Sequence, residues 1–131
     1  MEVTMDSIII TNNKLVFEKY KNLFQIVYDE NFSYVDVLEY VRNKIHEGHL
    51  LVTHPLSGSV KPNETPFKTI LISKKKESTV DFNSLSIIED SIATAKKFLN
   101  NKPTPNWPEK ILEDFRVIDL SLIENAINRM V

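Results

Sequence analysis

The stretch THPLSGSVKPNETP at residues 53–66 holds the side chains best suited to binding or chemistry. Its centre, Ser57-Gly58-Ser59, offers main-chain amides, two hydroxyl groups and a glycine that permits close approach, which are the ingredients of an anion-binding nest. Lys61 and His54 can add positive charge, and a lysine meets a carboxylate or a phosphate as a point charge. Further side chains of the stretch could hold amine or hydroxyl groups of the same ligand: Asn63, Glu64 and Thr65.

A purely structural role for this stretch stays open beside the binding role. Proline, serine, glycine and asparagine are also the residues that any turn requires. If Lys61 pairs with Glu64, the loop is a clasp; if Lys61 faces the amides of residues 57–59, its charge marks an anion site, which we favour. Ordered loops longer than about 12 residues without secondary structure are usually functional. We therefore expect a small anionic metabolite or a partner segment to bind here.

The three histidines, His46, His49 and His54, raise the question of metal binding or catalysis. A zinc site needs converging ligands, and an expected strand separates His49 from His54, so we expect neither a metal nor a cofactor. His54 remains a candidate acid/base of a small hydrolase or transferase, in which Lys61, Ser57 and Ser59 would hold a phosphate or carboxylate. Because no GxSxG elbow accompanies Ser57, a binding protein is the preferred interpretation and an enzyme the alternative.

Hydrophobic periodicity predicts the elements that must position these residues. Apolar and β-branched runs predict four strands, at 7–11, 24–28, 50–53 and 67–73. A helix from residue 14 to about residue 22 follows an asparagine cap at residues 12–13, and a second begins at the capping box of Ser33 and Asp36 and ends at Gly48. A long helix spans residues 85–99, another begins at residues 106–109, and a last one begins at Ser121.

This order of elements predicts a single α/β domain over residues 1–131. We expect a layered core at 8–100, with an at least partly parallel sheet of about four strands and flanking helices, and a helical extension at 104–131. The direction of the fourth strand is left open. Ligands of open α/β sheets bind beyond the carboxyl ends of the strands. Thr11, Asn12 and Asn13, which follow the first strand, should therefore share one edge and one site with Thr53 and the loop after it.

Composition excludes several other classes of function. The net charge of −2 and the dispersed basic residues give no reason to expect binding to nucleic acid or to a membrane surface. The chain has no cysteine, which excludes disulfides and thiolate chemistry. No stretch approaches the roughly 20 apolar residues of a membrane span, and the amino terminus has no basic segment typical of a signal peptide, so we expect a protein of the cell interior.

Two segments of the chain resemble the GrdX family. They are IITNN at 9–13 and VLEYVRNKIHEGHLLVTHPLSGSVKPNETPFKTILIS at 37–73, and the resemblance extends over roughly residues 8–100. GrdX proteins are small proteins encoded beside the glycine, sarcosine and betaine reductase genes of amino-acid-fermenting anaerobes. The resemblance implies a cytoplasmic accessory of that system, with a protein of the system as a possible partner, and supplies no catalytic residues. It supplies no oligomeric state either.

Overall fold

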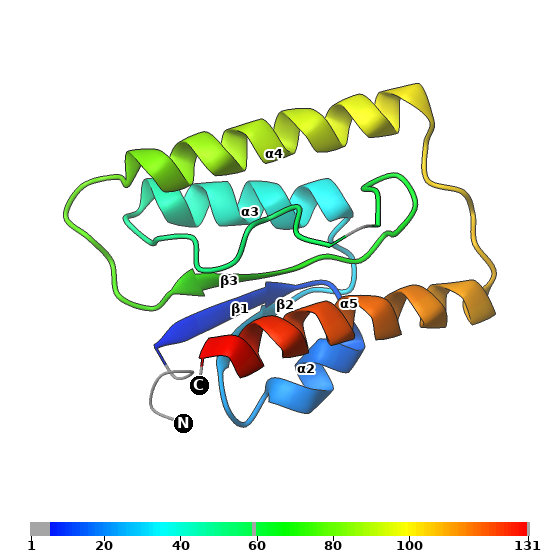
Figure 1. Ribbon diagram of the computed structural model, residues 1–131, viewed down its shortest axis with the longest axis horizontal. Helices are drawn as coiled ribbons and strands as arrows, with labels where there is room; N and C mark the ends of the chain where they lie inside the picture. The colour runs from blue at the N-terminus through cyan, green and yellow to red at the C-terminus, as the bar shows by residue number, and fades with distance from the viewer. Residues whose placement is uncertain (1–5, 59, 131) are drawn as a thin grey trace.

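The computed structural model describes residues 6–58 and 60–130, and it contains a three-stranded mixed sheet between two helical layers (Figure 1). The strand order is β2-β1-β3, with β2 parallel and β3 antiparallel to the central β1. The strands are β1 (Ser7–Thr11), β2 (Gln25–Tyr28) and β3 (Thr69–Ser73). The helices are α2 (Lys14–Tyr20), α3 (Tyr34–His46), α4 (Phe82–Asn101) and α5 (Glu109–Met130). This confirms an α/β fold with a partly parallel sheet.

Strands β1 and β3 are buried on both faces, which gives the protein two hydrophobic clusters. Alternate side chains of β1 and β3, such as Ile10 and Ile72, pack with α3 and α4 on one side of the sheet. The intervening side chains, Ile9 and Leu71, pack with α2 and α5 on the other side. A strand covered on both faces reads as a continuous apolar run, which is why the isoleucines of β1 are consecutive.

The helix boundaries follow the local signals in the sequence. The side chain of Asn13 caps α2 by accepting from the Leu15 amide, and Ser33 and Asp36 form the expected reciprocal capping box of α3. Gly48 follows the end of α3 with φ +112°, as expected of a residue at this position. A Cβ at Gly48 would lie 2.3 Å from the carbonyl oxygen of Glu77, so a side chain has no room there.

The prediction of a strand at residues 50–53 was wrong, which leaves three strands in the described sheet rather than about four. This segment runs beside β3 but forms only one bridge, between Leu51 and Ile72. One main-chain hydrogen bond remains on each side of the bridge, since the Val52 amide donates to the Leu71 carbonyl and the Ser73 amide to the Leu50 carbonyl. Side chains replace the other bond on each side, because Thr53 Oγ1 accepts from the Leu71 amide and Ser73 Oγ accepts from the Leu50 amide. The hydroxyl groups thus interrupt the regular ladder of main-chain hydrogen bonds.

The direction of β3, which the sequence left open, is antiparallel to β1. Because the bridge at Leu51 is also antiparallel to β3, residues 50–53 run in the same direction as β1. They lie on the other side of β3 from β1. Thr11 and Thr53 therefore end at the same edge, as expected. Strand β3 begins at Thr69 rather than at Phe67, where the sequence predicted its start, because two amides before it bond to side chains. The Phe67 amide donates to Thr65 and the Lys68 amide donates to Asn12.

The carboxyl-terminal region forms one helix of 22 residues, not the two helices that we expected. Ser121 lies within α5, and Glu124 of the same helix pairs with Lys19 of α2. The expected extension also supplies part of the core, because Ile123 and Ile127 pack against the sheet. Within the described residues, no helix combines the length and the apolar character that crossing a membrane requires.

Candidate functional site

A buried hydrogen-bond network joins the end of β1 to β3 and α5. Thr69 Oγ1 donates to Asp119 Oδ2 over 2.7 Å, and Asn13 Nδ2 donates to the same oxygen over 3.0 Å. Because Thr69 gives its only hydroxyl proton to Asp119, Thr11 Oγ1 donates to Thr69 over 2.7 Å. Thr11 in turn accepts from the Asn13 amide over 3.0 Å. The donors at this edge of the sheet therefore converge on one carboxylate.

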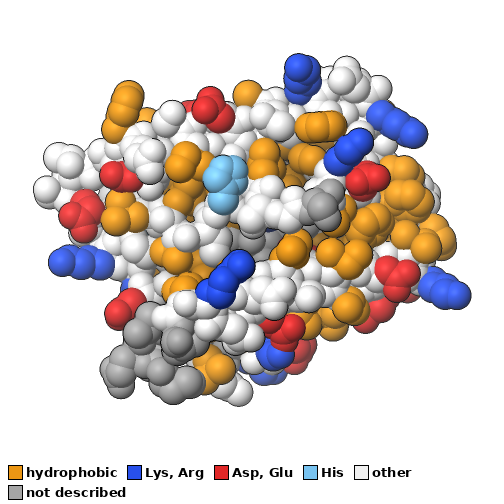
Figure 2. Space-filling view, viewed as in Figure 1, with side chains coloured by type: hydrophobic (Ala, Val, Ile, Leu, Met, Phe, Trp, Pro, Cys, Tyr) orange, Lys and Arg blue, Asp and Glu red, His pale blue; other side chains and the backbone are white. Residues whose placement is uncertain are grey.

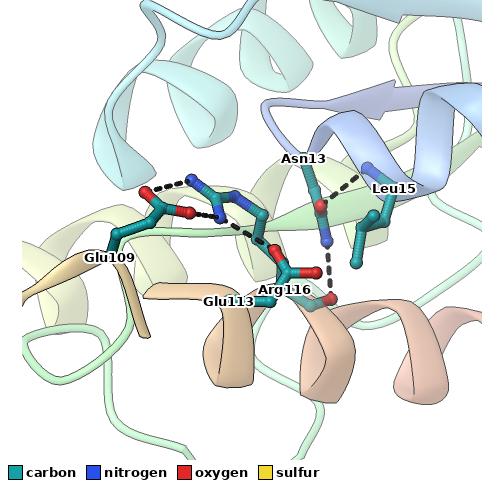
Figure 3. Close-up of polar contacts among 5 residues, drawn as sticks. All are labelled: Asn13, Leu15, Glu109, Glu113 and Arg116. Atoms are coloured by element: carbon teal, nitrogen blue, oxygen red, sulfur yellow. Dashed lines mark hydrogen bonds and ion pairs between the residues drawn. The ribbon is translucent and has the colours of Figure 1, made fainter. Parts of the chain in front are cut away.

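Asn13 is the link between this network and the start of α5 (Figure 3). Its Oδ1 accepts from the Leu15 amide, and its Nδ2 also donates to the Arg116 carbonyl over 2.9 Å. The Arg116 guanidinium is held by Glu109 over 2.6 Å and by Glu113 over 2.9 Å. Asn13 is fully buried, and every polar group of its side chain has a protein partner. Its role is therefore to fix α5 against the sheet.

Asn12 makes an equivalent connection to the loop that precedes β3. Its Nδ2 donates to the carbonyls of Phe32 and Pro66, over 3.0 Å and 2.8 Å, and its Oδ1 accepts from the Lys68 amide over 2.9 Å. These hydrogen bonds satisfy the Asn12 side chain completely. Of the residues expected to bind a ligand after β1, Thr11, Asn12 and Asn13 thus have their side-chain hydrogen bonds within the protein.

Lys68 places a buried cation close to Asp119. Burial lowers the pKa of Lys68, and the negative charge of Asp119 opposes this effect. Burial raises the pKa of Asp119, although hydrogen bonds from Asn13 and Thr69 and the charge of Lys68 oppose the increase. Lys68 forms no ion pair with any carboxylate of the described residues; its Nζ lies 5.7 Å from the centre of the Tyr34 ring. Burial of an ammonium group without an ion pair is unfavourable, so an anion beside Lys68 would stabilise its charged form.

Two small cavities adjoin Lys68 and Asp119, beneath the loop at 53–66. In each cavity the volume that the centre of a water molecule can occupy is about 10 Å³, so each cavity holds roughly one water. Both cavities are lined by Ser57, Lys68, Asp119 and Leu122. The first is completed by Tyr34, Val60, Thr65, Phe67, Phe115 and Ile118, and the second by Thr53, Thr69, Ile123 and Ala126. The loop therefore covers a small polar space built on a cation and a carboxylate.

The loop itself contributes hydroxyl groups and the predicted glycine. Thr53, Ser57 and Thr65 line the cavities, whereas Ser59 lies outside the described residues. Gly58 has φ +100°, and a Cβ there would lie 2.7 Å from Leu122 Cδ1 of α5. Gly58 is therefore required both by its positive φ and by the close approach of the loop to α5.

Lys61, Asn63 and Glu64 lie outside the walls of both cavities. Glu64 Oε1 accepts from the main-chain amide of Lys61 over 3.2 Å, and the two side chains form no ion pair in the described structure. The loop is attached to the chain before α5 by Asn63 Nδ2, which donates to the Lys102 carbonyl, and by Trp107 Nε1, which donates to the Glu64 carbonyl over 2.7 Å. These residues anchor the loop from outside.

The histidines are separated from the cavities. His46 and His54 are exposed, and the Nδ1 atom of His54 accepts from the Leu56 amide over 3.1 Å. His49 is buried, with its Nδ1 atom 2.6 Å from the Ser73 carbonyl oxygen. No observation on the described residues therefore favours the alternative of an enzyme that uses His54 as its acid or base.

A larger hollow lies beyond the carboxyl ends of β1 and β2. Its volume is about 220 Å³, and its walls are Asn12, Lys14, Tyr28, Glu30, Asn31, Phe67 and Arg116. Two carboxylates already neutralise Arg116, and Glu30 lies in the same wall as Lys14. This hollow therefore offers less uncompensated positive charge than Lys68 does.

Sequence reasoning missed Lys68, Asp119, Thr69 and Tyr34. Lys68 directly precedes an apolar strand, where a buried lysine is exceptional, and Asp119 interrupts the apolar stripe that Ile123 and Ile127 continue at a spacing of four. Lys68 and Asp119 were thus polar residues at positions where the neighbouring sequence predicted an apolar residue. The face that carries the 50–66 segment shows no such focus of charge, since its acidic and basic side chains are interspersed (Figure 2).

Comparison with known protein families gives one match for this chain. The family model described as GrdX-like protein matches residues 8–128. The match extends to almost the end of α5, well beyond the limit near residue 100 that the sequence motifs suggested. No curated protein and no solved structure matches the chain.

Proposed function

The chain belongs to the GrdX-like protein family, and we propose that it is a non-catalytic accessory protein that binds a small carboxylate-bearing molecule beneath the 53–66 loop. The observation that carries this proposal is the buried Lys68 ammonium, which borders two polar cavities and has no ion pair within the described structure. The carboxylate of the ligand would supply the missing anion. The hydroxyl groups of Ser57 and Thr65 would donate to its oxygens.

Asp119 narrows the class of ligand. A second negative charge near Lys68 disfavours a dianion such as phosphate, because Asp119 would repel it in a site of low dielectric. A ligand with an ammonium group as well as a carboxylate would bind both charges. The family resemblance associates the protein with the glycine reductase system of the cytoplasm, so glycine is the first zwitterion to test, with acetate as its anionic analogue.

The loop at 53–66 acts in this proposal as a lid. The cavities hold about one water each, so a ligand of even a few heavy atoms enters only when the loop moves away from α5. The contact of Gly58 with Leu122 places the loop directly on the helix, and Trp107 fixes its far end. Binding then closes the lid over the ligand and excludes water.

Thermal unfolding in the presence of glycine, acetate or phosphate, at constant ionic strength, tests the proposal. Glycine should raise the melting temperature most and phosphate least, by amounts set by the ligand concentration relative to its Kd. Lys68→Met should lose the response to all three, whereas the exposed Lys61→Ala should retain it. Asp119→Asn should respond to acetate at least as strongly as to glycine.

Two outcomes contradict the proposal. An equal response of wild type and Lys68→Met would show that the ligand binds elsewhere. A second such outcome is that Lys61→Ala loses the rise in melting temperature while Lys68→Met keeps it. The anion would then bind at Lys61 in the exposed part of the loop, as the sequence alone suggested.

A further inference from the structure

A further hollow lies on the α3 side of the sheet, between the end of α3 and strands β1 and β2. With about 390 Å³, it is larger than the cavities beneath the loop. Its floor is apolar and is formed by Ile8, Ile10, Val27, Tyr40 and Ile72, while Gln25, Lys44, Glu47, His49, Lys74 and Lys76 complete its walls. It exists because α3 packs over β1 and β3 and leaves the β2 side of this face without a helix.

The walls of this hollow carry excess positive charge. Glu47 is the only carboxylate among them, and its Oε1 lies 3.6 Å from Lys44 Nζ and 4.0 Å from Lys76 Nζ. Lys74 has no ion pair within the described part of the chain. Three ammonium groups thus share one carboxylate around an apolar floor, and this arrangement suits a partner that is both apolar and acidic.

The hollow opens beside a strand edge that the described sheet leaves unpaired. β2 lies at the end of the strand order. The Asp29 amide donates to the Thr11 carbonyl of β1, and main-chain groups of a strand alternate between its two neighbours. The amides and carbonyls of Ile26 and Tyr28 therefore point away from β1, toward the open edge. Val27, which faces the hollow, lies between them.

We propose that β2 and this hollow form a docking site for an extended acidic segment of another protein. The segment pairs with the free edge of β2, as in other cases of strand addition, and an apolar side chain on the α3 side reaches the floor beside Val27. Acidic side chains at alternate positions on the same side of the segment flank the apolar one and meet Lys44, Lys74 and Lys76. A second copy of this chain fits less well, because pairing of two β2 strands about a two-fold axis brings two sets of these lysines together.

Fluorescence polarisation tests this site with a labelled, acetylated hexapeptide of sequence Glu-Thr-Val-Thr-Glu-Thr, which presents glutamate and valine on one face of the strand. We expect binding that weakens with salt and falls at least tenfold in Lys74→Glu/Lys76→Glu. The control Lys97→Glu/Lys110→Glu, which reverses two exposed lysines on α4 and α5, should bind like wild type. A peptide methylated at alternate main-chain amides, in both registers, should not bind, because it cannot pair with the β2 edge.

Four results would overturn the proposal. They are the absence of binding at millimolar peptide, equal affinity for the methylated peptides, equal affinity for the same peptide with lysine in place of glutamate, and equal loss of affinity in both double variants. Analytical ultracentrifugation decides between occupants: a concentration-dependent dimer that the peptide displaces would assign the edge to a second copy of the chain.

Discussion

The two polar segments that end at the same edge of the sheet, residues 11–13 and 53–66, have similar chemistry but different environments. Both are rich in hydroxyl and amide groups. Thr11, Asn12 and Asn13 are buried, and their side chains bond to β3, α5 and neighbouring loops. In the second segment Ser57, Gly58, Lys61 and Glu64 are exposed. The difference arises from α5, which covers the first segment and is itself covered by the second.

Residues 11–13, with their hydrogen-bond partners on β3 and α5, form a fixed network, which we call the base. The loop at 53–66 lies over this base. In the base, each hydrogen bond joins elements that are distant in the sequence, so a single substitution disturbs several elements. In the loop, most contacts are local or involve only the chain around Lys102 and Trp107. Substitutions in the base should therefore cost stability, and those in the loop should chiefly change binding.

The largest expected effect is that of Asp119→Ala. The substitution leaves the buried donors of Asn13 and Thr69 without their acceptor and removes the carboxylate near Lys68. We expect the free energy of unfolding to fall by about 3 kcal/mol. Urea denaturation measures it, and Asp114→Ala, at an exposed position of the same helix, should cost less than about 0.5 kcal/mol. Equal effects of the two substitutions would show that the network does not stabilise the base.

A smaller loss is expected for Gly58→Val. The valine must adopt φ near +100° or distort the loop, and its Cβ displaces the Leu122 side chain. The free energy of unfolding should fall by about 1–2 kcal/mol, and the response to glycine should disappear. Ser57→Ala, next to it in the loop, should stay within about 0.5 kcal/mol of wild type. A Gly58→Val protein that keeps both its stability and its ligand response would exclude the proposed lid.

The pH dependence of stability isolates Lys68. Because burial lowers its pKa in the folded protein, the unfolded chain binds more protons between that pKa and the ordinary value of about 10.4. Stability therefore rises with pH across this window. The unfolding free energy of wild type minus that of Lys68→Met should accordingly increase from pH 8 to pH 9.5. A difference that is constant or decreasing would mean that Lys68 is not buried as described.

The smallest effect on stability is expected for Lys61→Ala. Its ammonium group makes no ion pair with the described residues, and the hydrogen bond to Glu64 uses the main-chain amide, which alanine retains. The free energy of unfolding should change by less than about 0.5 kcal/mol. Glu64→Gln, which weakens the acceptor of that bond, should cost slightly more. A loss above 1 kcal/mol for Lys61→Ala would restore the clasp as the role of this lysine.

Local signals in the sequence predicted much of this fold. The Asn13 cap, the capping box of Ser33 and Asp36, and the positive φ of Gly48 and Gly58 each depend on a few adjacent residues. The apolar runs predicted all three strands. The failures involve side chains that act over long distances in the sequence: the hydroxyls of Thr53 and Ser73 that interrupt a strand pairing could not be recognised without knowing which residues lie opposite them.

The sequence placed the candidate site at the carboxyl ends of the strands but did not identify the residues that the proposal now makes central. Hydroxyl and amide residues pointed to residues 11–13 and 53–66, which the structure brings together. Lys68 and Asp119 are 51 positions apart, and only folding places both beside the same cavities. The continuity of α5 was missed for a local reason, because Ser121 is of a type that often begins a helix but lies inside this one.

The central claim, that a small zwitterion binds between Lys68 and Asp119 under the loop, is tested most directly by NMR. Glycine is titrated into the ¹⁵N-labelled protein while the main-chain amide signals are followed. The account predicts saturable shifts for Ser57, Thr65, Lys68 and Thr69, which line the cavities, and their disappearance in Lys68→Met. Saturable shifts confined to the walls of either larger hollow, or no shifts at millimolar glycine, would contradict it.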